Sequence, residues 1–165
     1  GRTEFEREEP WYAWDYHVEA LDTSIMKERL EEVCENVQPF SYVHTLEIVQ
    51  RGREEVAEEL LVGTDTGEYH VYSEYNIRKV LCNGVADAVK QDGSTYFCKT
   101  LIPSGFIQLV CREGERGVIG YSISGGGFGH GNGMSQNGAN HMAEAGKTYE
   151  EILGLFYEGT SISEI

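Results

Sequence analysis

The feature that most constrains this chain is a glycine-rich run in the last quarter of the sequence. Glycine occupies positions 125, 127, 129, 131 and 133. In an extended segment, side chains alternate between two faces. One face of the run is then bare backbone, and the other carries the intervening side chains, among them Phe128 and His130. Bare backbone lets either a ligand or a neighbouring segment of the same chain approach closely.

The composition fits one domain with its own hydrophobic core. The 165 residues are 40% hydrophobic and 11% aromatic, which is enough to fold without disulfides or metals. The formal net charge is -15, whereas phosphate binding requires clustered Lys and Arg, so nucleic acid is not an expected partner. No stretch of the sequence approaches the ~18 apolar residues of a membrane span.

The four cysteines show no metal-site spacing. None belongs to a C-x-x-C pair, which disfavours a zinc ribbon. We expect buried free thiols, with one or two disulfides as the alternative, and we expect no metal or cofactor. The four residues are Cys34, Cys82, Cys98 and Cys111.

Local patterns predict an α+β fold, with a mainly antiparallel sheet, several short helices and a single domain. Residues 1–10 are charged and resemble a tail or the end of a linker, and residues 11–165 form the domain. The order of elements lacks the βαβ alternation of a parallel sheet. Helices are expected from Asp22 to Pro39, over 76–82, from Ser135 to Ala145 and from Thr148, and strands over 42–50, 56–63, 68–75, 106–111 and 117–124.

Two patterns that resemble nucleotide sites fail on spacing. Gly146-Lys147-Thr148 ends like a phosphate loop, but the glycine required five residues earlier is His141. The glycine run contains no strict G-x-G-x-x-G. We therefore do not expect a nucleotide.

The polar residues of the run and its exit are the candidates for chemistry. A glycine-flanked imidazole at His130 is accessible to a ligand, but the same histidine can also brace the loop through a hydrogen bond to backbone. Ser135 is expected to cap the following helix rather than to act as a nucleophile. Gln136, in the first turn of that helix, can face the same groove as His130.

Two further features have a structural and a functional interpretation. Trp11 and Trp14, with Tyr12 between them, are either core aromatics or a platform on which a sugar stacks. Arg78 lies in an otherwise apolar helical segment and is expected to form a structural ion pair with Glu74.

The run resembles the signature of the stage II sporulation protein D family, which includes the amidase enhancer of bacterial cell-wall lysis. Gly125 to Ala139 match the family pattern G-x-G-[WF]-G-H-G-x-G-M-S-Q-x-G-A. Asn132 replaces a small apolar residue common in the family, and Gly126 stands where some members carry arginine. Further matches follow the family's order: Pro10-Trp11 with Trp14, Arg51-Gly52, Ile77-Arg78 with Leu81, Ile102–Ser104, Met142–Gly146, Glu150–Leu153, Phe156-Tyr157 and Gly159-Thr160.

The resemblance implies part of a peptidoglycan lytic transglycosylase, which cuts glycan strands in cell-wall remodelling and sporulation. The family's acid/base glutamate lies in an E-A-L-K-A-Q-like helix near the N-terminus. Glu19-Ala20-Leu21 does not continue in that way. We therefore expect a C-terminal portion of a family member that has no catalytic residue of its own, is inactive alone and depends on a glutamate upstream. The substrate contacts implied are Gly127, Phe128, Gly129, His130, Gly131, Ser135 and Gln136.

The same resemblance implies the partners and the location. Expected partners are peptidoglycan glycan strands, a cell-wall amidase and the missing N-terminal portion of the same protein. The expected location is extracytoplasmic and faces the cell wall, with a signal or membrane anchor upstream. The alternative is a noncatalytic wall-binding or amidase-binding module like the amidase enhancer, and a third possibility is that the signature is structural.

Overall fold

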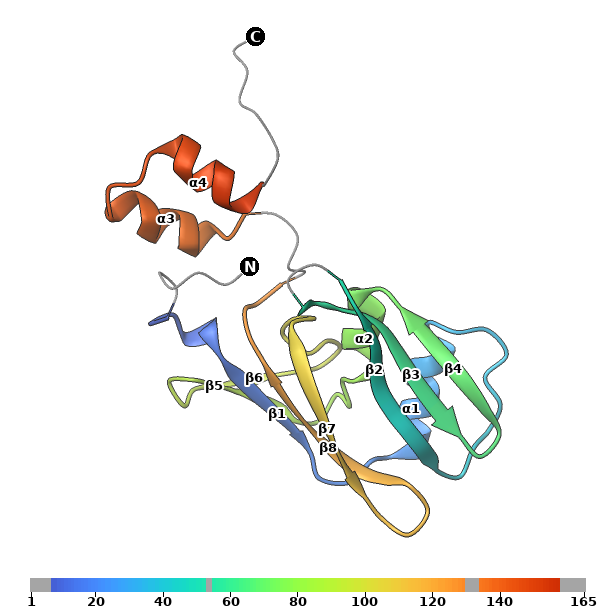
Figure 1. The fold of residues 1–165 in the computed structure, drawn as a ribbon. Coiled ribbons are helices and arrows are strands. Elements are labelled where there is room, and N and C mark those ends of the chain that lie inside the picture. Colours follow the sequence, from blue (N-terminus) through green and yellow to red (C-terminus); the bar gives the residue numbers. More distant parts are fainter. Residues whose placement is uncertain (1–6, 53–54, 130–133, 158–165) are drawn as a thin grey trace.

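The computed structural model describes residues 7–52, 55–129 and 134–157. Short strands and helices follow one another throughout this part of the chain (Figure 1). In chain order they are η2 (Pro10–Tyr12), β1 (Trp14–Val18), α1 (Thr23–Glu31), β2 (Val43–Arg51), β3 (Ala57–Thr64), β4 (Gly67–Tyr72), α2 (Glu74–Val80), β5 (Asp87–Lys90), β6 (Thr95–Phe97), β7 (Ile107–Glu113), β8 (Val118–Gly125), α3 (Gln136–Glu144) and α4 (Tyr149–Phe156).

The strands form two antiparallel sheets. The larger sheet has the order β6-β5-β1-β8-β7, and the smaller has the order β2-β3-β4. Every strand pair in both sheets is antiparallel. The α+β class with a mainly antiparallel sheet is therefore confirmed.

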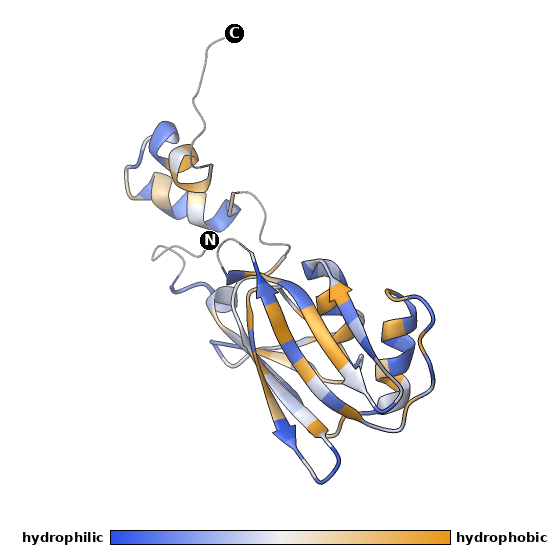
Figure 2. Cartoon of the chain, turned by 45° about the vertical axis from the view of Figure 1, so that its right-hand side comes forward, coloured by the Kyte–Doolittle hydropathy of each residue, from blue (hydrophilic) through white to orange (hydrophobic). Residues whose placement is uncertain are grey.

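One hydrophobic core joins the two sheets to α1 and α2. On β1, Trp14, Tyr16 and Val18 are buried and alternate with exposed side chains. The same cluster contains Leu30 from α1 and Ile77 from α2. Figure 2 shows apolar and polar positions alternating along the strands, as half-buried strands require. Trp14 at the start of β1 is paired in register with Gly125, so the glycine run begins next to this buried strand.

Several local predictions are confirmed and some are wrong. Asp22 caps α1 by accepting hydrogen bonds from the backbone N–H groups of Ser24 and Ile25. α1 nevertheless ends at Glu31 rather than near Pro39, because the chain turns there and the N–H groups of Val33 and Cys34 both donate to the Leu30 carbonyl oxygen. Asn36 then adopts a left-handed φ of 56°. Three strands of the larger sheet, β1, β5 and β6, were not predicted from the sequence.

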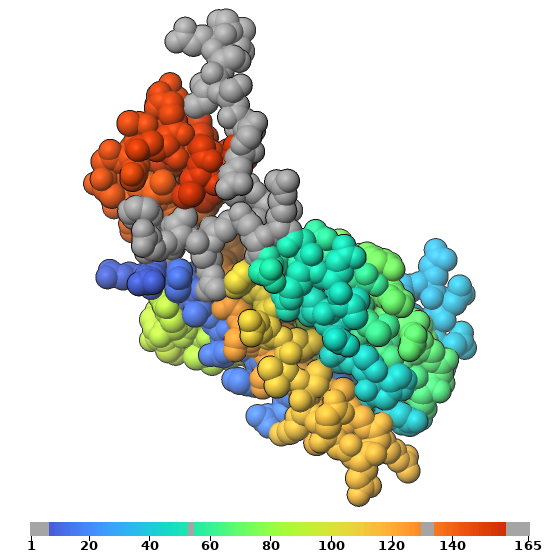
Figure 3. Space-filling model, in the orientation of Figure 1, coloured from blue at the N-terminus to red at the C-terminus, as the bar shows by residue number. Residues whose placement is uncertain are grey.

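α3 and α4 form a helical hairpin with its own small apolar contact. Met142 and Ile152 are buried although neither belongs to the main core. The hairpin forms a lobe set off from the two sheets (Figures 1 and 3). The capping box predicted between Thr148 and Glu151 is present at the start of α4.

Other sequence predictions concern membranes and cysteines. Within the described residues, no helix is both long and apolar enough to cross a membrane. The four cysteines are free thiols, and Cys82 and Cys98 are buried. Burial raises the pKa of the Cys98 thiol to about 11, so this sulfur stays protonated and unreactive at neutral pH.

Candidate functional site

The glycine run begins against the core tryptophan of β1. The backbone N–H of Gly127 donates to the carbonyl oxygen of Trp11 over 2.7 Å. The indole Nε1 of Trp14 donates to the carbonyl oxygen of Gly127 over 3.0 Å. A Cβ on Gly125 would collide with the Trp14 indole. Glycine at position 125 therefore serves close packing within the chain.

A second segment, residues 102–106, holds the other side of the run. The Ser104 hydroxyl is buried and donates to the carbonyl oxygen of Gly126 over 2.7 Å. Gly129 N–H donates to the carbonyl oxygen of Pro103 over 2.9 Å, and Ser104 and Gly129 form a parallel bridge. The run is thus held on both sides just after β8 ends at Gly125.

Arg78 fixes the position of this second segment by hydrogen bonds to its backbone. Its guanidinium donates to the carbonyl oxygens of Ile102 over 3.0 Å and Pro103 over 3.1 Å. It also pairs with Glu74 over 3.2 Å, which confirms the predicted ion pair. Pro103 therefore accepts from both Arg78 and Gly129. Arg78 acts as a positioning residue, because it contacts the run only through the Pro103 carbonyl.

The run is more open at Gly127 and Gly129 than at Gly125. Gly127 has a φ of 75° and Gly129 a φ of 123°, a region that favours glycine. A Cβ at either position would meet no atom of the described residues within 4 Å. The two interpretations of the bare backbone therefore apply to different glycines: Gly125 is covered by the chain itself, whereas Gly127 and Gly129 remain accessible to a ligand.

An exposed aromatic cluster surrounds this open backbone. The Phe128 ring lies 4.6 Å from the Trp11 ring and 5.4 Å from the Tyr96 ring, between centroids. Trp11 and Tyr96 are themselves 5.4 Å apart, edge to face. Lys90 Nζ lies 5.1 Å from the centre of the Trp11 ring. We name Trp11, Tyr96, Phe128 and Lys90 the aromatic cluster.

The structure separates the two tryptophans that the sequence grouped together. Trp14 is 1% exposed and belongs to the core. Trp11 and Tyr12 are half-buried, and Trp11 joins the aromatic cluster. The core interpretation is confirmed for Trp14, whereas the sugar platform at Trp11 stays a prediction.

Sequence reasoning missed Tyr96 and Lys90 as members of the cluster. They lie on β6 and β5, on either side of a tight turn in which Lys90 N–H donates to the carbonyl oxygen of Ser94. The dipeptide Asp92-Gly93 could have indicated them, because Asp-Gly is typical of the turn of a β-hairpin. That turn places the two strands side by side.

The start of α3 carries the remaining predicted contacts. Ser135 Oγ accepts the Gly138 backbone N–H over 3.1 Å, so Ser135 is the helix cap that the sequence predicted. Gln136 is the first helical residue and its side chain is exposed. His130 and Gly131 lie outside the described residues. Their place beside Gln136 remains a prediction.

Glu9 connects α3 to the segment that precedes β1. One carboxylate oxygen lies 2.8 Å from His141 Nε2, and the other accepts from Asn137 Nδ2 over 3.2 Å. Glu9, followed by Glu144, raises the pKa of His141 through these contacts. α3 is thus attached next to Trp11 by an ion pair that forms only when His141 is protonated.

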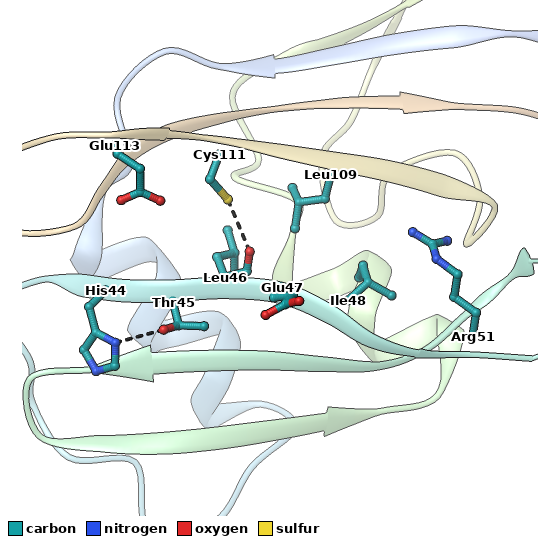
Figure 4. Close-up of a pocket in the computed structure, with 9 residues that line it drawn as sticks. All are labelled: His44, Thr45, Leu46, Glu47, Ile48, Arg51, Leu109, Cys111 and Glu113. Atoms are coloured by element: carbon teal, nitrogen blue, oxygen red, sulfur yellow. Dashed lines mark hydrogen bonds between the residues drawn. The ribbon is translucent and has the colours of Figure 1, made fainter.

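A groove lies between the edge strands β2 and β7 (Figure 4). Its volume is about 430 Å³. The Cys111 thiol donates to the Leu46 carbonyl oxygen across it over 3.2 Å. Its lining side chains mix both charge signs, and no group of three metal-ligating side chains occurs anywhere in the described ranges. The lining residues are His44, Thr45, Leu46, Glu47, Ile48, Arg51, Leu109, Cys111 and Glu113.

Comparisons with known proteins give one family and several local relatives. The model of the family described as Domain of unknown function (DUF8618) matches residues 2–133. Stage II sporulation protein D of Bacillus subtilis is 63% identical over 38 residues, which are 23% of this chain and 11% of that protein. The amidase enhancer of Bacillus subtilis is 56% identical over 43 residues, which are 26% of this chain and 6% of that protein.

A longer stretch of the chain is similar to an uncharacterized protein of Brachyspira hyodysenteriae. It is 38% identical over 76 residues, 46% of this chain and 19% of that protein. The chain therefore spans about a fifth or less of the curated relatives it matches. The matches to stage II sporulation protein D and the amidase enhancer confirm the resemblance seen in the sequence.

Proposed function

The chain belongs to the family described as Domain of unknown function (DUF8618), and from its local identity with stage II sporulation protein D and the amidase enhancer we propose a cell-wall role. The ligand is the glycan strand of peptidoglycan. The names of these relatives refer to sporulation and to an amidase, and we connect both with the cell wall. The surface that binds the strand is the open part of the glycine run together with the aromatic cluster.

The observation that carries this proposal is the open backbone at Gly127 and Gly129 on either side of the exposed Phe128 ring. A pyranose ring has apolar C–H faces, which pack on aromatic rings, and polar edges, which hydrogen-bond with backbone. Glycines leave room for such an edge to approach. Trp14 and Ser104 hold the segment in place, so little ordering is required when the strand binds.

In the finer form of the proposal, the chain is part of a lytic transglycosylase whose acid/base glutamate lies outside this sequence. That carboxylic acid protonates the glycosidic oxygen as the C1–O4 bond breaks. The muramic C6 hydroxyl oxygen then bonds to C1, and its proton returns to the carboxylate. Nearby Glu9 is engaged with His141 and Asn137, and Glu74 with Arg78. We therefore assign the general-acid role to neither Glu9 nor Glu74.

The test is to incubate the chain with peptide-free peptidoglycan glycan and to measure both binding and anhydromuramic products. We expect binding without turnover. Where the gene encodes residues before Gly1, the longer product should bind and also release anhydromuramic ends, detected by mass spectrometry. Turnover by the short chain would contradict the missing glutamate, and absence of glycan binding would contradict the cell-wall role.

A second candidate is a noncatalytic module that binds a cell-wall amidase. The 56% local identity with the amidase enhancer favours it, and exposed aromatic residues such as Phe128 and Tyr96 also occur in protein interfaces. The two candidates differ in one readout. An amidase partner predicts that Phe128→Ala abolishes stimulation of the amidase while glycan binding stays unchanged.

A further inference from the structure

We propose that the aromatic cluster is a subsite for one muramic acid residue, with Phe128 and Tyr96 against the sugar ring and Lys90 paired with its lactyl carboxylate. This inference rests on the proposed glycan binding and narrows it to one kind of sugar. It distinguishes peptidoglycan strands from neutral polymers of N-acetylglucosamine.

The geometry provides two exposed aromatic surfaces on a fixed base. Phe128 is 55% exposed and Tyr96 is 41% exposed, although both touch the half-buried Trp11. Their rings are inclined at 84° to each other, so they form a corner rather than a flat stack. A corner of this kind contacts both the face and the edge of one sugar ring. Exposing several adjoining apolar rings to water is unfavourable, so a patch of this kind indicates a binding surface.

Lys90 provides the charge. It is the last residue of β5 and is paired in register with Trp14 of β1, so the rigid larger sheet fixes its backbone. Its ammonium lies over the Trp11 ring, and among the residues that the structure describes no carboxylate forms an ion pair with it. Asp92 lies close enough to interact electrostatically with Lys90, but its carboxylate accepts a hydrogen bond from the Ser94 hydroxyl over 2.6 Å. The ammonium is therefore available to a ligand.

The surrounding charge makes this lysine selective. Only 13 residues of the chain are Lys or Arg, against 28 Asp and Glu. The net negative field repels polyanions such as nucleic acid. A single carboxylate that sits next to Lys90 is attracted locally, and removal of stem peptides by an amidase leaves such a carboxylate on muramic acid. A neutral N-acetylglucosamine ring offers nothing to this ammonium.

The experiment compares two oligosaccharides of equal ring number by isothermal titration calorimetry at low salt. One is peptide-free peptidoglycan glycan, and the other is a chitin oligomer. Phe128→Ala should weaken both ligands by roughly 3- to 10-fold, the loss of one aromatic contact. Lys90→Gln should weaken only the muramic ligand, by about 2- to 5-fold. This second effect should disappear at high salt.

Two matched controls lie elsewhere on the surface. Phe97→Ala removes an equally exposed ring from the next residue of β6, where the alternation of a strand directs the side chain to the other face. Lys79→Gln removes a lysine that also lies over an aromatic ring, that of Tyr75 at 5.8 Å, and that in addition pairs with Glu32 over 2.8 Å. Both variants should bind both ligands like the parent. Thermal melting of each variant should show an intact fold.

The outcomes separate this inference from the function on which it rests. If the parent chain binds neither oligosaccharide, the proposed glycan binding is wrong. If the parent binds peptide-free glycan but Phe128→Ala and Lys90→Gln bind it equally well, the subsite is wrong and glycan binding stands. If the parent binds the chitin oligomer as tightly as the muramic ligand, Lys90 does not select the carboxylate.

Discussion

The indole Nε1 of Trp14 donates a 3.0 Å hydrogen bond to the carbonyl oxygen of Gly127, which ties the glycine run to the core of the larger sheet. The same indole occupies the space next to Gly125 that a side chain would fill. Trp14 is therefore the residue through which packing of the core determines the path of the run.

Trp14→Phe should keep an aromatic ring in the core but remove the donor to Gly127. The variant leaves a partly buried carbonyl without its partner and a small cavity beside it, so the free energy of unfolding should fall by about 2–3 kcal/mol. Urea denaturation followed by circular dichroism measures this change. Tyr72→Phe, on an exposed residue of β4, serves as the control and should leave stability unchanged. A loss below about 0.5 kcal/mol for Trp14→Phe would show that the indole hydrogen bond does not anchor the run.

Alanine at three glycines should give three different results. Gly125→Ala should destabilise most, because the new Cβ collides with Trp14. Gly127→Ala has open space but a φ of 75°, so it should cost only about 1 kcal/mol of backbone strain. Gly154→Ala, inside α4 and with no described atom within 4 Å of the new Cβ, should add stability of about 0.5–1 kcal/mol.

Denaturation midpoints of the three glycine variants measure this order. Gly125→Ala combined with Trp14→Leu should destabilise by less than the sum of the two single changes, since the smaller side chain makes room for the new methyl group. Strict additivity of the Gly125 and Trp14 changes would argue against a direct collision.

Three helix starts were predicted better than the strands or the site, for physical reasons. Asp22, Ser135 and Thr148 cap their helices through hydrogen bonds to backbone no more than three residues away. Such local interactions are written in a short stretch of sequence. By contrast, β5 has four residues and β6 has three. Segments this short contain too few positions for a two-residue alternation to be recognised.

The aromatic cluster was beyond sequence reasoning because its members come from distant segments. Trp11 precedes β1, Tyr96 lies on β6, and Phe128 follows β8. They meet because β5 and β8 both pair with β1, a long-range register that no local pattern specifies. The glycine run itself was recognised, but the sequence did not reveal which glycines face the core. That distinction depends on the position of Trp14.

Arg78→Met should be strongly destabilising and should also loosen the run. The substitution leaves the carbonyl oxygens of Ile102 and Pro103 and the carboxylate of Glu74 without their partner, and breaking a buried pair in this way costs about 3–5 kcal/mol. Arg78→Lys should not restore stability, because one ammonium group cannot reach the two carbonyl oxygens and the Glu74 carboxylate at the same time as the planar guanidinium does. Hydrogen exchange should show faster exchange of the Gly129 amide in the lysine variant.

The control for Arg78 is Arg112→Lys, whose side chain is 54% exposed and pairs with Glu19 at the surface. It should change stability by no more than a few tenths of a kcal/mol. Full stability of Arg78→Lys would mean that the ion pair with Glu74 matters and the two carbonyl contacts do not.

The attachment of α3 should weaken as the pH rises. Glu9 raises the pKa of His141 above its ordinary value near 6.5, so the stabilisation is fully present below that value and is lost as the pH rises through the higher folded pKa. Glu9→Gln should bring the pKa of His141 back toward 6.5, measured by NMR titration of the imidazole. Glu8→Gln, one residue away, should leave the pKa of His141 raised. An unchanged pKa in Glu9→Gln would show that α3 is not held by this pair, and the lobe would then depend on Asn137 alone for its contact with Glu9.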